Sequence, residues 1–164
     1  MQPGTRKACL LAVVAGVVLV VLGGEAVAQS NNDVGTWNLN VAKSTYSPGP
    51  VPKSATLRIE PAGSGGVKVT VDQVLPDGTK RHWEYTANYD GKDTRITGNN
   101  PDADMVARTR INATTIQTVN KKGGKVTTTN TAMISSDGKT RTITYKGTNG
   151  QGQTVNNVGV YEKQ

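Results

Sequence analysis

The chain has 164 residues, and its 19 lysines and arginines against 12 aspartates and glutamates give a formal net charge of +7. The basic residues are spread along the chain with acidic ones among them, which indicates a solvated surface and excludes a run of positive charge suited to nucleic acid. A single cysteine, Cys9, excludes a framework of disulfides within the chain.

The N-terminal segment has the parts of an export signal. Arg6 and Lys7 supply positive charge, residues 8–22 are uncharged and mostly Ala, Val and Leu, and residues 26–28 begin and end with alanine. The apolar run is shorter than the ~20 residues of a spanning helix. We expect residues 1–28 to be a signal peptide cleaved after Ala28, and residues 29–164 to form one periplasmic or secreted domain without stable membrane insertion. An uncleaved N-terminal anchor is the alternative.

The rest of the chain alternates between turn signals and short strands. Asp-Gly and Asn-Gly pairs supply the positive φ angles of tight hairpins, for example at Asp77-Gly78, Asp90-Gly91 and Asp137-Gly138. Between the turns, apolar and polar residues alternate, which is typical of strands with one buried face. The expected strands are residues 36–41, 56–60, 67–72, 79–89, 94–97, 104–111, 115–121, 125–135, 140–146 and 154–162.

This succession predicts an all-β fold, an antiparallel up-and-down meander of about eight to ten strands. A long meander hides its edges by closing into a barrel, and a β-sandwich of similar strand count is the alternative. The one long connection, residues 42–54, contains Pro48, Pro50 and Pro52 and so excludes regular helix across its second half.

Strand phase places aromatic and cationic side chains on faces that point inward. Trp83, Tyr85 and Tyr89 share one face of their strand. Arg81 lies on that same face, and Arg141 shares a face with Ile143 and Tyr145. Two interpretations remain open: the arginines anchor an anionic or polar ligand, or they lie at the barrel rim and extend into water.

A third inward face is polar. Asn130 and Thr128 share it with Val126, Ala132 and Ile134, which suits a polar or amphipathic ligand. A modest threonine-rich core with few cavities is the alternative.

Sites for catalysis, metals and cofactors are not expected. His82 alternates onto the wet face, and no cysteine follows residue 28, so zinc ligands are lacking. The Asp-Gly turns offer too few oxygen ligands for calcium. Asp102 and Asp104 fit loop caps better than an acid-base pair. The sequon at Asn112 is interpreted as a hairpin turn, and no nucleophile elbow is present. We therefore expect no enzyme activity, no cofactor and no metal.

Two terminal segments resemble the calycin superfamily of lipocalins and fatty-acid-binding proteins. Gly35-Thr36-Trp37 is similar to the Gly-x-Trp signature of their first strand, and Val160-Tyr161-Glu162-Lys163 looks like the closing strand of the fatty-acid-binding branch. The resemblance implies a lipocalin-like barrel with a cavity for a small lipophilic molecule. It implies Tyr161 as a pocket group and Trp37 as a core residue. Gly159 stands where that branch has a carboxylate-binding arginine, which argues against fatty-acid binding in that mode.

Together these features predict a non-enzymatic, monomeric binding protein that holds a small amphipathic or polar ligand and no nucleic acid. The alternative is a structural or protein-interaction domain of the cell envelope with a filled core. The expected ligand-binding residues are Arg81, Trp83, Tyr85, Tyr89, Asn130, Arg141, Tyr145 and Tyr161.

Overall fold

The computed structural model describes residues 31–164, so the expected signal peptide and its cleavage site lie outside the described residues. One short 3-10 helix, η1 (Val41–Lys43), is the only helix in this range, and no described helix is long and apolar enough to cross a membrane. The strands are β1 (Gly35–Leu39), β2 (Ser54–Ala62), β3 (Gly66–Val74), β4 (Lys80–Ala87), β5 (Asp90–Arg95), β6 (Thr97–Gly98), β7 (Met105–Arg110), β8 (Thr115–Lys122), β9 (Lys125–Ile134), β10 (Thr140–Thr148) and β11 (Thr154–Lys163).

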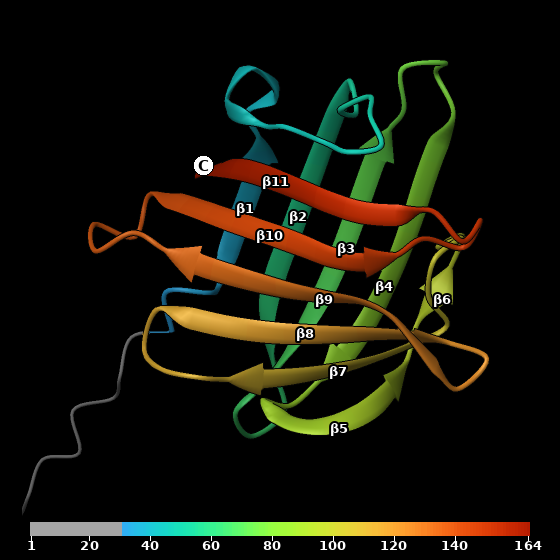
Figure 1. The fold of residues 1–164 in the computed structure, drawn as a ribbon. Coiled ribbons are helices and arrows are strands. Elements are labelled where there is room, and N and C mark those ends of the chain that lie inside the picture. The colour runs from blue at the N-terminus through green and yellow to red at the C-terminus, as the bar shows by residue number, and fades with distance from the viewer. Residues whose placement is uncertain (1–30) are drawn as a thin grey trace, which may run out of the picture.

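All the described strands belong to one antiparallel sheet, in the order β5-β7-β8-β9-β10-β11-β1-β2-β3-β4-β6. Most neighbours in the sheet are neighbours in the chain, and turns that contain glycine join five of these pairs, for example β2 to β3 and β9 to β10. The first and last strands meet inside the sheet, where Trp37 of β1 lies opposite Lys163 of β11. Figure 1 shows this meeting as the blue strand beside the red one. The expected meander is confirmed, and a single sheet rules out the sandwich of two sheets.

The two ends of the sheet are joined by the segment that contains β5 and β6. β5 pairs with β7, and β6 pairs with β4. Only Ile96 separates β5 from β6 in the chain. Gly98 has φ +102°, and its backbone lies so close to His82 and Trp83 that a β-carbon would overlap the His82 carbonyl. The sheet thereby closes almost completely into a barrel.

The hairpin predicted at Asp90-Gly91 is wrong, because β5 pairs with β7 and not with β4. Asp90 does stabilise a local turn by accepting a hydrogen bond from the backbone N–H of Lys92 at 3.1 Å. The sequence therefore predicts the local turn at Asp90 but not the pairing of β5 with β7.

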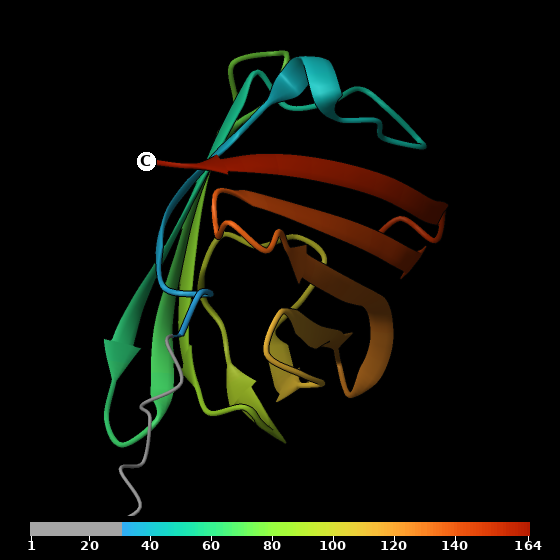
Figure 2. The same ribbon diagram turned by 90° about the vertical axis from the view of Figure 1, so that its left-hand side faces the viewer.

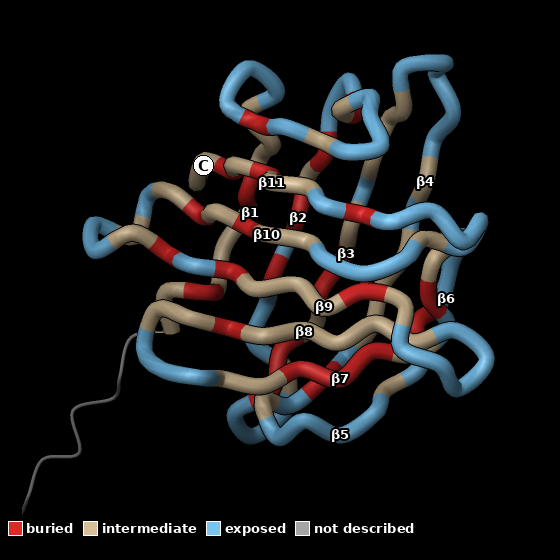
Figure 3. The backbone as a smooth tube through the Cα atoms, in the orientation of Figure 1, coloured by how far each residue is buried: buried red, intermediate tan, exposed pale blue. Residues whose placement is uncertain are grey.

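The core lies between two groups of strands that face each other. Figure 2 shows β1 to β4 on one side and β8 to β11 on the other. Side chains alternate between buried and exposed along β2, where Ala55, Leu57 and Ile59 are buried. Trp37 is fully buried and packs into the same cluster. Figure 3 shows the buried positions as short segments spread around the barrel wall.

The long connection before β2 folds back over β11. Thr45 forms a bridge with Val158, and the Asn156 N–H donates to the Ser47 carbonyl at 2.8 Å. The Ser47 N–H donates to the side-chain oxygen of Asn157, also at 2.8 Å. These bonds hold the proline-rich part of the connection at one end of the barrel, where it contributes to the interior cavity described below.

Candidate functional site

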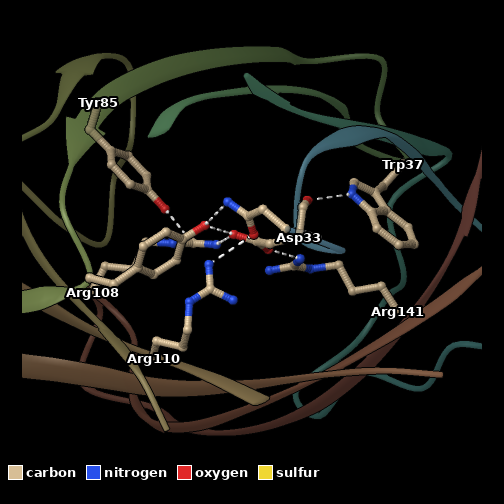
Figure 4. A network of polar contacts seen from close by, with 8 residues as sticks. Asp33, Trp37, Tyr85, Arg108, Arg110 and Arg141 are labelled. Carbon is tan, nitrogen blue, oxygen red and sulfur yellow. Dashed lines mark hydrogen bonds and ion pairs between the residues drawn. The ribbon is translucent and has the colours of Figure 1, made fainter. Parts of the chain in front are cut away.

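An aspartate from the segment before β1 lies at the centre of the barrel's polar interior. A turn closed by the Val34 N–H and the Asn31 carbonyl at 3.0 Å brings Asp33 inside, where it is fully buried. The Trp37 indole N–H donates to the Asp33 carbonyl at 3.1 Å. One residue of the first strand thus holds the backbone of Asp33 while the carboxylate points into the interior (Figure 4).

The Asp33 carboxylate accepts hydrogen bonds from three side chains. Arg108 of β7 donates to Oδ2 at 2.5 Å, and Arg141 of β10 donates to Oδ1. The Tyr89 hydroxyl donates to Oδ2 as well. Both arginines are 2% exposed, so these are ion pairs shielded from water. In Figure 4, Arg108 and Arg141 approach the carboxylate from opposite sides.

These contacts decide the ionisation of the network. Burial alone would raise the pKa of the Asp33 carboxyl, but Arg108 and Arg141, together with the Tyr89 hydroxyl, hold it well below its usual range. For Arg108, burial lowers the pKa, whereas Tyr85 and Asp33 raise it, and the net direction is upward. The carboxylate and the guanidinium of Arg108 are therefore charged at neutral pH.

The positive charges outnumber the negative one. Two fully buried arginines face one buried carboxylate, and the Nε atoms of both arginines are buried without a hydrogen-bond partner. Arg108 also donates to the Tyr85 hydroxyl at 3.2 Å. Arg110 adds a further cation, stacked 3.9 Å from the centroid of the Tyr89 ring and bonded to Asn31. Buried charges in proteins are normally paired, so this cluster has capacity for an additional anion.

A cavity of about 300 Å³ adjoins the two arginines. One wall, from β8 and β9, is polar and contains Thr118, Asn120, Thr128 and Asn130. The facing wall is apolar and contains Leu57, Val71, Trp83 and Ile96. The side-chain oxygen of Asn130 is buried and has no hydrogen-bond partner. The cavity therefore combines an apolar surface with polar groups that remain available.

Three tyrosines close another part of the cavity. The hydroxyls of Tyr145 and Tyr161 lie 3.4 Å apart, and the ring centroids of Tyr46 and Tyr145 are 6.3 Å apart. Burial raises the pKa of each of the three phenols, so they are neutral hydrogen-bonding groups. Pro48, Pro50 and Pro52 of the long connection line the same cavity.

Gly159 lies against this tyrosine cluster. A β-carbon at Gly159 would be 3.0 Å from a ring carbon of Tyr161 and 3.4 Å from the Tyr46 hydroxyl. An arginine at this position, as the calycin resemblance implies, would therefore require the tyrosine rings to shift. Arg108 and Arg141 place positive charge in the interior from other strands.

The predicted site residues mostly lie together. Tyr89 does not line the cavity and instead bonds to Asp33. The remaining predicted residues all line the cavity: Arg81, Trp83, Tyr85, Asn130, Arg141, Tyr145 and Tyr161. The rim interpretation is wrong for Arg141, which is buried, whereas Arg81 is half-buried and lines the cavity.

Sequence reasoning missed Asp33 and Arg108. Arg108 alternates in phase with the buried Val106, so the rule that identified Arg141 would have identified it too. Asp33 lies before the first strand, so no alternation of apolar and polar residues indicates which way its side chain points.

The other candidate sites behave as structural groups. His82 pairs with Asp72 at 2.7 Å on the surface. Asp102 and Asp104 accept backbone N–H bonds from Gly150 and Gly123, as loop caps do. Among residues 31–164, no group of three or more His, Cys, Asp and Glu side chains is arranged to hold a metal ion.

No protein-family model matches the chain, and no curated protein matches it either. The geometry alone therefore defines what the site can do. It offers guanidinium groups to an anion, an unpaired amide oxygen to a donor and an apolar wall to a hydrocarbon group.

Proposed function

We propose that the protein is an exported, non-enzymatic binding protein that holds a small amphipathic anion inside its barrel, in the manner of a calycin. The acidic group of the ligand lies beside Arg108 and Arg141, and its hydrocarbon part lies along the apolar wall. The export signal predicted from the sequence supports a role outside the cytoplasm.

The unequal number of buried charges carries this proposal. Arg108 and Arg141 are both 2% exposed and share the single carboxylate of Asp33. An uncompensated guanidinium in a low-dielectric interior is unfavourable by several kcal/mol. An acidic ligand beside Arg108 and Arg141 would balance the excess positive charge, which makes anion binding favourable.

The shape and lining of the cavity support an amphipathic ligand. Its volume of about 300 Å³ is at the lower end of the range for ligand sites. Trp83, Ile96 and Val71 offer apolar surface across from the polar wall. A domain that served only as an envelope scaffold would have no need of such a space, so the interior favours binding over the filled-core alternative.

A series of ligands that differ only in the charge of the head group tests the proposal. Decanoate, decanol and decylammonium are titrated into the purified domain, residues 29–164, by calorimetry, and the increase in melting temperature is measured in parallel. Decanoate is expected to bind at least about tenfold tighter than decanol, because only the anion pairs with a guanidinium. Decylammonium is expected not to bind. Equal affinity for all three, or no binding of decanoate, would contradict the proposal.

Two arginine variants test where the acidic group of the ligand binds. Arg141→Met removes one buried guanidinium, and Arg58→Met removes an arginine that is half-exposed and pairs at 3.9 Å with Asp72. Decanoate affinity should fall in the first variant and stay unchanged in the second. Circular dichroism spectra that match the unmodified domain show that both variants are folded.

A further inference from the structure

We propose that the ligand carries a hydroxyl group a few atoms from its acidic group, and that Asn130 recognises this hydroxyl. The inference rests on the proposed function and names the class of ligand more closely, as a hydroxylated amphipathic acid. Two observations carry it: the position of Asn130 relative to Arg108, and the unpaired state of its side-chain oxygen.

Asn130 and Arg108 lie in one row across the barrel wall. Arg108 of β7 is opposite Thr118 of β8, and Thr118 is opposite Asn130 of β9. Adjacent strands are roughly 4.8 Å apart, so the backbones of Arg108 and Asn130 are separated by about 10 Å. Both side chains point into the same cavity. A ligand with its acid beside Arg108 therefore passes Asn130 within the first few atoms of its chain.

The Asn130 amide differs from the other asparagines of the cavity. Its Oδ1 atom is buried and without a partner. Asn120 donates to the Thr128 hydroxyl at 2.9 Å, and Asn157 accepts the Ser47 N–H at 2.8 Å. Asn100 and Asn149 also accept backbone N–H bonds. Four of these side chains thus make hydrogen bonds within the protein, whereas the oxygen of Asn130 has no partner there.

A hydroxyl is the group that fits this environment. It donates to an amide oxygen and also accepts from an amide nitrogen, so it pairs with the Asn130 side chain in either orientation of the amide. A plain alkyl chain would cover Asn130 and exclude water without replacing the missing hydrogen bond. A site with an unpaired polar group discriminates strongly against a ligand that cannot pair with it.

Three acids with the same number of carbons test the inference on the unmodified domain. Decanoate has no hydroxyl, 3-hydroxydecanoate has one close to the carboxylate, and 10-hydroxydecanoate is an isomer with the hydroxyl at the far end. The expected order is 3-hydroxydecanoate about tenfold tighter than decanoate, with no such gain for 10-hydroxydecanoate. This comparison needs no variant, so it is independent of any effect on folding.

Two variants then test whether Asn130 is the residue that recognises the hydroxyl. Asn130→Leu has a side chain with the same branching but without polar atoms, and it should abolish the preference for 3-hydroxydecanoate while decanoate still binds. Thr129→Val removes a hydroxyl from the residue beside Asn130 on β9, which does not line the cavity, and should keep the preference. The ligand-free Asn130→Leu domain should melt no lower than the unmodified one, because the amide that it replaces has an unpaired buried oxygen.

The outcomes separate this inference from the function on which it rests. If none of the acids binds, both fail. If decanoate and 3-hydroxydecanoate bind equally, the inference fails and the proposed function stands. If the preference persists in Asn130→Leu, or disappears in Thr129→Val as well, Asn130 is not the recognising group and the inference is overturned.

Discussion

Replacing Asp33 by asparagine tests the idea that one carboxylate holds two buried arginines together. The change keeps the size of the side chain and removes its charge. Arg108 and Arg141 would then be buried without a counter-ion, because both reach only Asp33 through an ion pair. Breaking a buried ion pair by removing one partner lowers the free energy of unfolding by about 3–5 kcal/mol. Asp33→Asn should therefore destabilise the domain by at least that amount.

The measurement is urea unfolding followed by circular dichroism. Asp93→Asn is the matched control, because Asp93 also pairs with a cation, Lys121 at 2.7 Å, but with its side chain 41% exposed. Exposed pairs contribute roughly 0–1 kcal/mol, so the control should change little. If Asp33→Asn unfolds within about 1 kcal/mol of the unmodified domain, the reasoning about the buried pair is refuted.

A third variant distinguishes the loss of charge balance from the loss of packing. In the triple variant Asp33→Leu, Arg108→Met and Arg141→Met, the three buried charged groups of the ion pairs are replaced together by apolar side chains, so neither arginine is left without its counter-ion. Such replacements of buried ionic groups are often neutral or stabilising. The triple variant should therefore be more stable than Asp33→Asn. A triple variant that is less stable would show that packing, and not charge, decides the effect.

Three further predictions concern the same network and the closure of the barrel. The lowered pKa of Asp33 means that its stabilising effect is complete above about pH 4 and declines as the pH falls, because the unfolded state takes up the proton first. The melting temperature of Asp33→Asn should therefore fall less than that of the unmodified domain when the pH is lowered from about 5 to 2. If the melting temperatures of the two proteins fall in parallel, the prediction is contradicted. Sodium formate should raise the melting temperature of Asp33→Ala more than sodium chloride does, since formate replaces the missing carboxylate; equal effects of the two salts would count against it. Gly98→Ala should lower stability by about 2 kcal/mol or more, because its β-carbon would lie 2.8 Å from the Trp83 Cα, and Gly63→Ala, with positive φ but open space, should lower it less. Equal losses in the two glycine variants would show that backbone conformation, and not closure of the barrel, sets the effect.

The sequence predicts most of the fold because local rules determine most of it. Alternation along β2 and β10 places Leu57 and Ile143 inside, and glycine-containing turns fix where the strands reverse. The pairing of β5 is not predictable in this way. Asp90-Gly91 gives the same local turn whichever strand comes next, and the barrel closes through a contact with β7 that no local pattern indicates.

The candidate site is predictable where it is built from strands. Arg141 and Asn130 are identified by phase, because a strand position fixes the direction of its side chain. Asp33 could not be identified, since it belongs to a turn before β1 and its partners Arg108 and Arg141 are 75 and 108 residues away in the chain. The interior arginines could be recognised from the sequence, but their counter-ion could not.

The meeting of β1 and β11 inside the sheet has a consequence for how the domain folds. Trp37 pairs with Lys163, so the barrel wall is incomplete until nearly the whole chain is present. Loop closure over such separations is slow, because chain entropy is lost before the contacts form. During synthesis Asp33 precedes both of its arginines, and a chain released before β11 would expose the unpaired edges of β1 and β10 to other chains.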